Sequence, residues 1–315
     1  MNPFPNLFLL GAPKSGTTFI FGLLQNAPDV FTSHRKEPAY FLVYGQKIKY
    51  KERLVTPLPS SFSEDKYREI YAGRTERYII DASTHYLSSP ETAARIHAAN
   101  PDAKVIAVLR EPVSRAYSHY LMGIRDGFVT EDFVDALRHE QKEMQDTDTL
   151  WSEHYRFIRR SLYLEGLQAF HSLFGDNFRV YLFSDIKSNP DFVIDDLCGF
   201  LDLPSEDLRS GIEDAERNPY AVDRFPMVTR LVQRYRESPL RRFVNSITPS
   251  SFRDRMRIGF DKKRLVAAEK PKLSDEARQI LVEALGNDFD ASLAFARQNS
   301  FLKEAPSNEP VRGAV

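Results

Sequence analysis

The chain contains 315 residues, of which 42% are hydrophobic, and its formal net charge is −1. This length and apolar content predict one α/β domain or two smaller ones with a substantial core. Because acidic and basic residues nearly balance, the composition favours neither a nucleic acid nor an anionic membrane as partner. The single cysteine, Cys198, excludes an intrachain disulfide, and we expect a buried thiol within the apolar stretch 192–203.

The beginning of the sequence lacks the basic region and long apolar run of an export signal, and no stretch approaches the ~20 apolar residues of a membrane span. These features, with the lone cysteine, predict a cytoplasmic protein without a membrane span. We expect a single domain over residues 1–302. The segment 303–315, which contains Pro306, Pro310 and Gly313, is expected to be a flexible tail.

Residues 7–18 predict a strand, a turn and the start of a helix. The apolar run 7–10 is typical of a buried strand, the turn begins at Gly11, and from Thr17 the apolar residues recur with helical spacing. Backbone amides of such a turn converge on one point, and the helix dipole there favours negative charge. The segment therefore predicts an anion-binding loop, with a turn that binds nothing as the alternative.

This loop differs from the loop of nucleoside triphosphatases, which follows the pattern G-x-x-x-x-G-K-[ST]. Gly11 and Gly16 have the right spacing, but Thr17 stands where the lysine belongs. The lysine of this loop is Lys14, two residues before Gly16. The loop could thus enclose a phosphate while its cation approaches from another direction.

A second anion site is predicted after the apolar stretch 103–110, which is typical of a central strand in a parallel sheet. This strand ends on Arg110, and a helix beginning at Pro112 carries Ser118 about two turns further on. A guanidinium and a hydroxyl suit a phosphate, although an arginine at a sheet edge is the plainer reading. A kinase of the P-loop type would carry a magnesium-binding aspartate at such a strand end.

Glu37 is the most notable carboxylate of the sequence. It follows a short β-prone run at 30–33 and the basic residues Arg35 and Lys36, and Pro38 and two aromatic residues come after it. At the carboxyl end of a strand it would lie where α/β sheets bind ligands; the alternative is a surface salt-bridge cluster. The irregular segment 42–76 is either part of an acceptor-binding wall or a plain surface loop.

Strands and helices alternate along the rest of the chain. A strand is expected at 78–81, and Ser89 is a plausible N-cap of a helix over 90–99. Together these patterns predict an α/β fold, with a P-loop-like central parallel sheet flanked by helices on both faces. The second half is expected to contain helices at 163–174, 189–201, 228–244 and 274–297 and a strand at 178–183.

The two anion motifs together resemble those of PAPS-dependent sulfotransferases, specifically the heparan-sulfate-type and bacterial carbohydrate branch. PAPS is 3′-phosphoadenosine 5′-phosphosulfate. The resemblance is clearest over residues 6–128. It implies that the 5′-phosphosulfate loop consists of Lys14, Ser15, Gly16, Thr17 and Thr18. It assigns the 3′-phosphate to Arg110 and Ser118, with help from Tyr163, and it makes Glu37, followed by Tyr40 and Phe41, the catalytic base.

The resemblance implies transfer of a sulfonate group from PAPS to an acceptor hydroxyl on a carbohydrate or another bacterial metabolite, with adenosine 3′,5′-bisphosphate (PAP) as product and without a metal. Glu37 would act as base and Lys14 would stabilise the leaving phosphate. The sequence departs from the family at Ala82, where the segment 81–86 should carry a lysine; Lys36 or His85 could compensate. His34 and Asp81 are rival bases.

Other functions remain open at this stage: a P-loop kinase-like phosphotransferase, or a nucleotide-binding module without catalysis. The basic segment 253–272, which includes Arg253, Arg257 and Lys272, either closes over the nucleotide, as in the family, or is a solvated face. The sequence does not identify the acceptor, the choice between O- and N-sulfation, or the oligomeric state.

Overall fold

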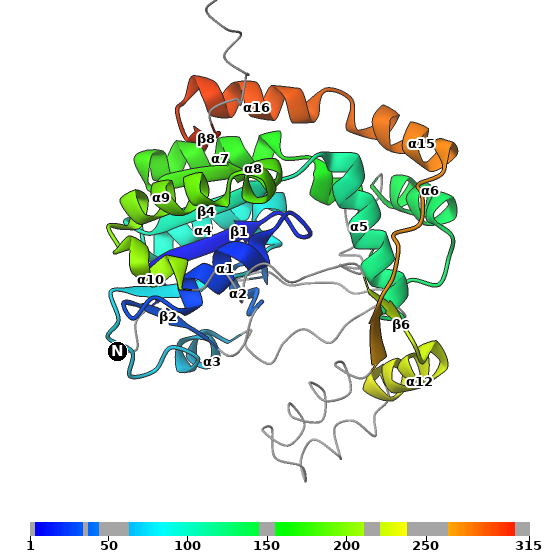
Figure 1. Cartoon of the computed structure of the whole chain (residues 1–315), viewed down its shortest axis with the longest axis horizontal. Coiled ribbons are helices and arrows are strands. Elements are labelled where there is room, and N and C mark those ends of the chain that lie inside the picture. The colour runs from blue at the N-terminus through cyan, green and yellow to red at the C-terminus, as the bar shows by residue number, and fades with distance from the viewer. Residues whose placement is uncertain are drawn as a thin grey trace, which may run out of the picture.

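A parallel sheet lies at the centre of the molecule (Figure 1). The computed structural model describes residues 4–33, 37–43, 63–144, 155–210, 221–237 and 264–305. Within these residues six strands pair in parallel in the order β2-β3-β1-β4-β5-β8. The strands are β1 (Leu7–Gly11), β2 (Val30–Thr32), β3 (Tyr78–Asp81), β4 (Lys104–Leu109), β5 (Phe178–Leu182) and β8 (Leu302–Lys303).

β1 occupies the middle of the sheet, where Leu7 pairs with Ile80 of β3 on one side and with Lys104 of β4 on the other. Because all three strands are parallel, their carboxyl ends meet at one edge. The segments that follow β1, β3 and β4 therefore lie at the same edge, which is where ligands bind in open α/β sheets.

One face of the sheet packs against helices α1 (Thr17–Gln25), α9 (Pro190–Leu201) and α10 (Ser205–Arg209). Alternate residues of β1, Leu7 and Leu9, point to this side, as the two-residue period of a strand requires. They share an apolar cluster with Leu23 of α1 and Leu197 of α9. Cys198 belongs to the same cluster and is buried, which confirms the predicted buried thiol.

The opposite face packs against α4 (Pro90–Ala99), α7 (Leu164–Phe174) and α16 (Asp288–Gln298), with the short helices α2 (Tyr40–Val43) and α3 (Glu64–Glu69) near β3. Phe8 and Leu10 of β1 contribute to this side, together with Ile96 of α4 and Phe170 of α7. Helices on both faces of a parallel sheet confirm the predicted fold class.

A third apolar cluster lies beside the sheet and joins α5 (Pro112–Arg125), α6 (Phe133–Glu143) and α15 (Asp275–Leu285). Two short antiparallel strands, β6 (Ala221–Asp223) and β7 (Leu265–Ala267), lie near the far end of α5, next to α12 (Pro226–Glu237) (Figure 1). α8 (Phe183–Ser188) follows β5 directly. Of these elements, α5 and α8 begin at the sheet edge described above, since they follow β4 and β5.

The structure differs from the sequence prediction at several elements. The single helix predicted at 274–297 is two helices, because α15 ends at Gly286, which has a φ of 51°. The helix predicted at 228–244 begins earlier, at Pro226, and residues 238–244 lie outside the described residues. Ser89 stands at the N-cap of α4, but its hydroxyl donates to Glu91 and makes no capping bond.

The ends of the predicted domain and tail are only partly covered. β8 includes Lys303, the first residue assigned to the tail, and residues 306–315 lie outside the described residues. Most of the segment 42–76 lies outside them too, since 44–62 are not described. Among the helices described, none is both long and apolar enough to cross a membrane.

Candidate functional site

Two glycines shape the loop between β1 and α1. Gly11 has a φ of 124°, and a Cβ on it would lie 2.2 Å from the carbonyl oxygen of Thr84. Gly16 is the N-cap of α1 in the left-handed conformation, and a Cβ there would lie 2.8 Å from the ring of Phe183. A side chain at either position would therefore displace the segments packed against the loop.

The predicted phosphosulfate residues lie together in this loop. Ser15 is fully buried, and its Oγ lies close enough to Tyr163 to lower the pKa of that tyrosine but makes no hydrogen bond of normal geometry to a described atom. Thr17 is the buried first residue of α1, whereas Thr18 is exposed. The first turn of α1 has no side-chain cap, and the N–H of Phe19 donates to the carbonyl oxygen of Gly16 at 2.9 Å. A buried orphan hydroxyl beside an uncapped helix start fits a bound phosphate or sulfate group.

Arg110 directly follows β4 and connects the two predicted anion motifs. Its Nη1 donates to the carbonyl oxygen of Lys14 at 2.9 Å, and its guanidinium lies 4.5 Å from the ring centroid of Phe183. Burial lowers the pKa of Arg110, and the neighbouring Tyr163 and Glu111 oppose this shift. Phe183, which the sequence analysis did not identify, thus contacts both Gly16 and Arg110.

Tyr163 supports Arg110 through the backbone of that arginine. The tyrosine hydroxyl donates to the carbonyl oxygen of Arg110 at 2.9 Å, and the side chain is buried. Burial raises the pKa of Tyr163 to about 12, although nearby Arg115 and Ser15 lower it. The hydroxyl therefore remains protonated at neutral pH and keeps donating. The structure brings Lys14, Arg110 and Tyr163 together, with the Tyr163 hydroxyl bonded to the backbone of Arg110.

Arg115 is a second arginine at the site that the sequence analysis missed. It is fully buried, and it donates to Ser161 Oγ at 2.7 Å and to the carbonyl oxygens of Phe157 at 2.6 Å and Pro13 at 3.4 Å. Burial lowers its pKa to about 10, so it stays charged at neutral pH. The phosphosulfate loop is thereby tied to the segment that leads into Tyr163.

Glu140 of α6 fixes the same segment from the other side. Its carboxylate accepts the backbone N–H groups of Phe157, Ile158 and Arg159 at 2.7, 2.8 and 3.0 Å. Burial raises the pKa of Glu140 to about 7, although these three donors and Arg115 lower it. The segment 157–161 is thus held through both its N–H groups and its carbonyl groups.

A second cation lies near Arg110. The Nζ of Lys270 is 4.9 Å from the ring centroid of Tyr117 on α5, and the Tyr117 hydroxyl donates to the carbonyl oxygen of Lys272. Burial lowers the pKa of Lys270, and the positive charge of Arg110 lowers it further. Ser118, the residue after Tyr117, is half-buried. The carboxylate of Glu111 opposes this lowering of the Lys270 pKa.

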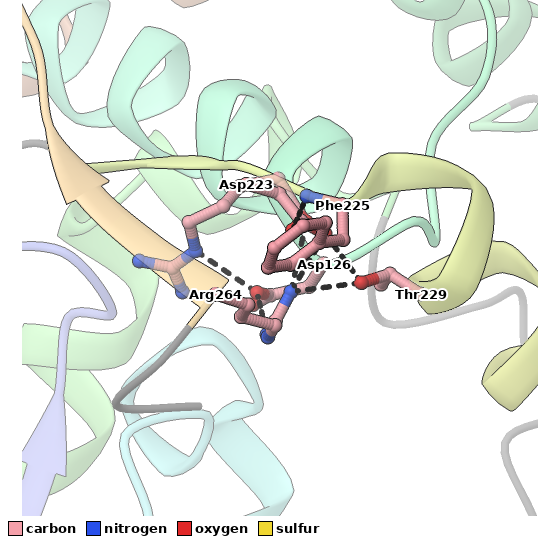
Figure 2. A network of polar contacts seen from close by, with 6 residues as sticks. Asp126, Asp223, Phe225, Thr229 and Arg264 are labelled. Carbon is pink, nitrogen blue, oxygen red and sulfur yellow. Dashed lines mark hydrogen bonds and ion pairs between the residues drawn. The ribbon is translucent and has the colours of Figure 1, made fainter. Parts of the chain in front are cut away.

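Figure 2 shows how Arg264, within the basic segment 253–272, is anchored. Arg264, just before β7, donates to Asp126 at the end of α5 (3.0 Å) and to Asp223 of β6 (3.1 Å). Asp223 also accepts bonds from the hydroxyl of Thr229 and the N–H of Phe225. From Arg264 the chain runs alongside α5 toward α15 (Figure 1). On this path Lys270 lies against Tyr117 of α5; residues 253–263 lie outside the described residues.

Glu37 is half-buried, and its carboxylate is held by Thr84. The backbone N–H of Thr84 donates to Oε2 at 2.8 Å and its hydroxyl donates to Oε1 at 2.9 Å. The N–H of Glu37 donates to the carbonyl oxygen of Ala82. The sequence analysis had given Thr84 no role; its place in the segment after β3 was the only available signal.

The rival bases have different outcomes. Asp81 is fully buried and accepts hydroxyl bonds from Tyr67, Ser83 and Tyr86 at 2.6 to 2.8 Å. Burial raises its pKa to about 6, against the effect of those donors. A carboxylate so enclosed cannot reach an acceptor. His34 lies outside the described residues, as does Lys36.

No group of three or more histidine, cysteine, aspartate or glutamate side chains in the described part of the chain could hold a metal ion. Independence from metal remains a prediction.

The fold and the loop define the class of protein: an α/β protein in which a loop bounded by Gly11 and Gly16 joins β1 to α1. The model of the sulfotransferase family matches residues 5–207, more than half of the chain. The chain therefore belongs to the sulfotransferase family, which confirms the family predicted from the motifs.

Individual relatives are distant. The chain is 32% identical over 123 residues to the membrane-associated sulfotransferase kil1 of Dictyostelium discoideum, covering 38% of this chain and 23% of kil1. It is 28% identical to human heparan sulfate glucosamine 3-O-sulfotransferase 6, covering 52% and 42%. The chain thus spans less than half the length of these relatives.

A solved structure supports the fold independently. The crystal structure of a sulfotransferase from Alicyclobacillus acidocaldarius matches 93% of this chain and 96% of its own, with a TM-score of 0.63 and 22% identity. At this identity the match establishes a shared fold.

Proposed function

We propose that this protein transfers a sulfonate group from PAPS to an acceptor hydroxyl. The observation that carries the proposal is the bond from Arg110 to the backbone of Lys14, which joins the loop after β1 to the arginine after β4. PAPS carries a phosphate on the 3′ position of its ribose and a phosphosulfate on the 5′ position. A site for PAPS therefore needs two linked anion positions. The cofactor supplies the sulfonate, and PAP is released.

The loop would hold the 5′-phosphosulfate. The amides at the start of α1 and the orphan hydroxyl of Ser15 would donate to its oxygens. Lys14 would stabilise the charge that grows on the phosphate as the sulfonate departs. Gly16 admits no side chain because Phe183 packs against it, so the backbone stays close to the ligand.

The 3′-phosphate would bind beside α5. Arg110 and Lys270 provide two cations whose mutual repulsion a phosphate would relieve, and Ser118 offers a hydroxyl. Tyr163 and Phe183 hold Arg110 in place through its backbone and its guanidinium. AMP and ATP lack the 3′-phosphate, and the site should discriminate against both.

Glu37 would act as general base. It would take the proton of the acceptor hydroxyl while the acceptor oxygen bonds to sulfur and the bond from sulfur to the phosphate oxygen breaks. General base catalysis contributes ~10²–10⁴-fold to a rate. The relative named as a heparan sulfate glucosamine 3-O-sulfotransferase supports a carbohydrate hydroxyl as acceptor, although another metabolite would satisfy the same chemistry.

The test is mass spectrometry of an acceptor panel incubated with PAPS and the enzyme. The panel contains de-O-sulfated heparan sulfate, chondroitin, monosaccharides and simple phenols. We expect the gain of one sulfonate on at least one of them. Glu37→Gln should lower kcat about 100-fold or more. Glu165→Gln, on the exposed first turn of α7, is the matched control and should leave kcat unchanged. Absence of transfer to every acceptor contradicts the proposal.

A further inference from the structure

Thr84 donates a hydrogen bond to each carboxylate oxygen of Glu37. Thr84 uses its backbone N–H for Oε2 and its hydroxyl for Oε1, so the two oxygens are bound by donors fixed on the same residue. Such a two-point contact restrains the rotation of the carboxylate as well as its position. Glu37 and Thr84 are 47 residues apart, so this contact exists only in the folded chain.

The backbone around Glu37 needs external support. Glu37 and Ala39 have φ angles of 59° and 54°, a conformation that residues with a Cβ adopt rarely. The N–H of Glu37 donates to Ala82 at 3.2 Å, and the N–H of Ala39 donates to the hydroxyl of Ser83 at 2.9 Å. The strained turn is therefore held by consecutive residues of the segment that ends in Thr84.

Thr84 also contacts the phosphosulfate loop. Its carbonyl oxygen lies 2.2 Å from the position that a Cβ on Gly11 would take. The Thr84 backbone therefore packs directly against the start of the loop. One residue thus touches the anion loop through its carbonyl group and the Glu37 carboxylate through its N–H and hydroxyl groups. The distance between loop and carboxylate is set by Thr84.

We propose that Thr84 is a positioning residue that aims the Glu37 carboxylate at the sulfonate held by the loop. This inference rests on the proposed function and adds to it how the base is oriented.

The test compares Thr84→Val, which keeps the shape and the backbone N–H but removes the hydroxyl, with Thr84→Ser, which restores it. The probe is PAPS with the best acceptor of the panel. Thr84→Val should lower kcat about 10- to 100-fold, because small displacements of a catalytic group have effects of this size. PAP affinity, measured by calorimetry, should stay within about two-fold, since the hydroxyl is bonded to Glu37.

Two comparisons separate positioning from a general structural role. Thr84→Ser should recover kcat to within about three-fold of the wild type. Thr92→Val is the matched control, because Thr92 of α4 is buried and its Oγ1 has no hydrogen-bond partner in the described structure. It should retain wild-type turnover and PAP affinity.

The decisive measurement is a double-mutant cycle with Glu37→Gln. If Thr84 acts through the base, Thr84→Val should cause no further loss in the Glu37→Gln background. An equal loss in both backgrounds, or wild-type turnover of Thr84→Val, overturns the positioning role while leaving sulfonate transfer intact. If the wild type transfers sulfonate to no acceptor of the panel, the proposed function fails and the inference fails with it.

Discussion

Arg110→Ala should remove most of the preference of the protein for PAP over AMP. A hydrogen bond to a charged group contributes about 1.5–3 kcal/mol, which corresponds to about 10- to 150-fold in Kd. The substitution also deletes the bond to Lys14 and the stacking on Phe183, whose guanidinium-to-ring distance is 4.5 Å. Losing these two contacts loosens the loop equally for PAP and for AMP. The ratio of the Kd values for PAP and AMP therefore isolates the contribution of the 3′-phosphate.

The assay is calorimetric titration of wild type and variant with PAP, AMP and ATP. Arg179→Ala is a matched control: its guanidinium lies 4.7 Å from the Phe200 ring, but at the opposite end of the neighbouring strand β5. It should leave the PAP-to-AMP ratio unchanged. ATP binding as tight as PAP binding in the wild type, or an unchanged ratio in Arg110→Ala, would refute the assignment of Arg110 to the 3′-phosphate.

Three further predictions concern the loop and its supports. Lys14→Ala should lower kcat more than PAP affinity, since leaving-group charge grows in the transition state; steady-state kinetics and calorimetry separate the two, and loss of binding alone would make Lys14 a tether. Gly11→Ala should reduce kcat sharply because its Cβ would lie 2.2 Å from the Thr84 carbonyl oxygen; wild-type kinetics would contradict the close contact. Burial raises the pKa of Glu140 to about 7, so the folded state binds a proton more tightly than the unfolded state. The free energy of unfolding should therefore fall as the pH rises from the ordinary glutamate pKa to about 7. Denaturant titrations at pH 5 and 8 should show a smaller fall in Glu140→Gln, and an equal fall would contradict this.

The sequence predicted the elements whose signals are local. β1, the loop and α1 follow from a short apolar run, two glycines and a helical pattern, all within residues 7–25. β4 could be recognised because a strand buried on both faces is continuously apolar. Lys14 and Arg110 were identified because each stands at a fixed place in such an element.

Elements with weak local signals were missed. β8 has two residues, Leu302 and Lys303, and exists because they pair with β5. The break between α15 and α16 depends on Gly286, but a glycine within a helical pattern does not by itself end a helix. Neither outcome could be derived from periodicity.

The supports of the site were missed for a related reason: their partners are distant in sequence. Arg115 donates to Pro13 across 102 residues, and Thr84 reaches Glu37 across 47. Hydrophobic periodicity and motif spacing describe neighbours along the chain. Contacts of this kind become visible only when the sheet brings the carboxyl ends of β1, β3 and β4 to one edge.

Arg110 and Arg115 show why motif residues and supporting residues must be separated by geometry. Both lie in the same strand-to-helix segment, Arg110 directly after β4 and Arg115 in the first turn of α5. Arg110 is half-buried at the sheet edge, whereas Arg115 is fully buried and directs its three bonds to oxygens of the protein itself. Burial lowers the pKa of both guanidinium groups, but an arginine remains protonated at neutral pH in either place. The two guanidinium groups donate to consecutive carbonyl oxygens of the loop, Arg110 to that of Lys14 and Arg115 to that of Pro13. Arg110 can meet a ligand phosphate there, whereas Arg115 fixes the loop to which that ligand would bind.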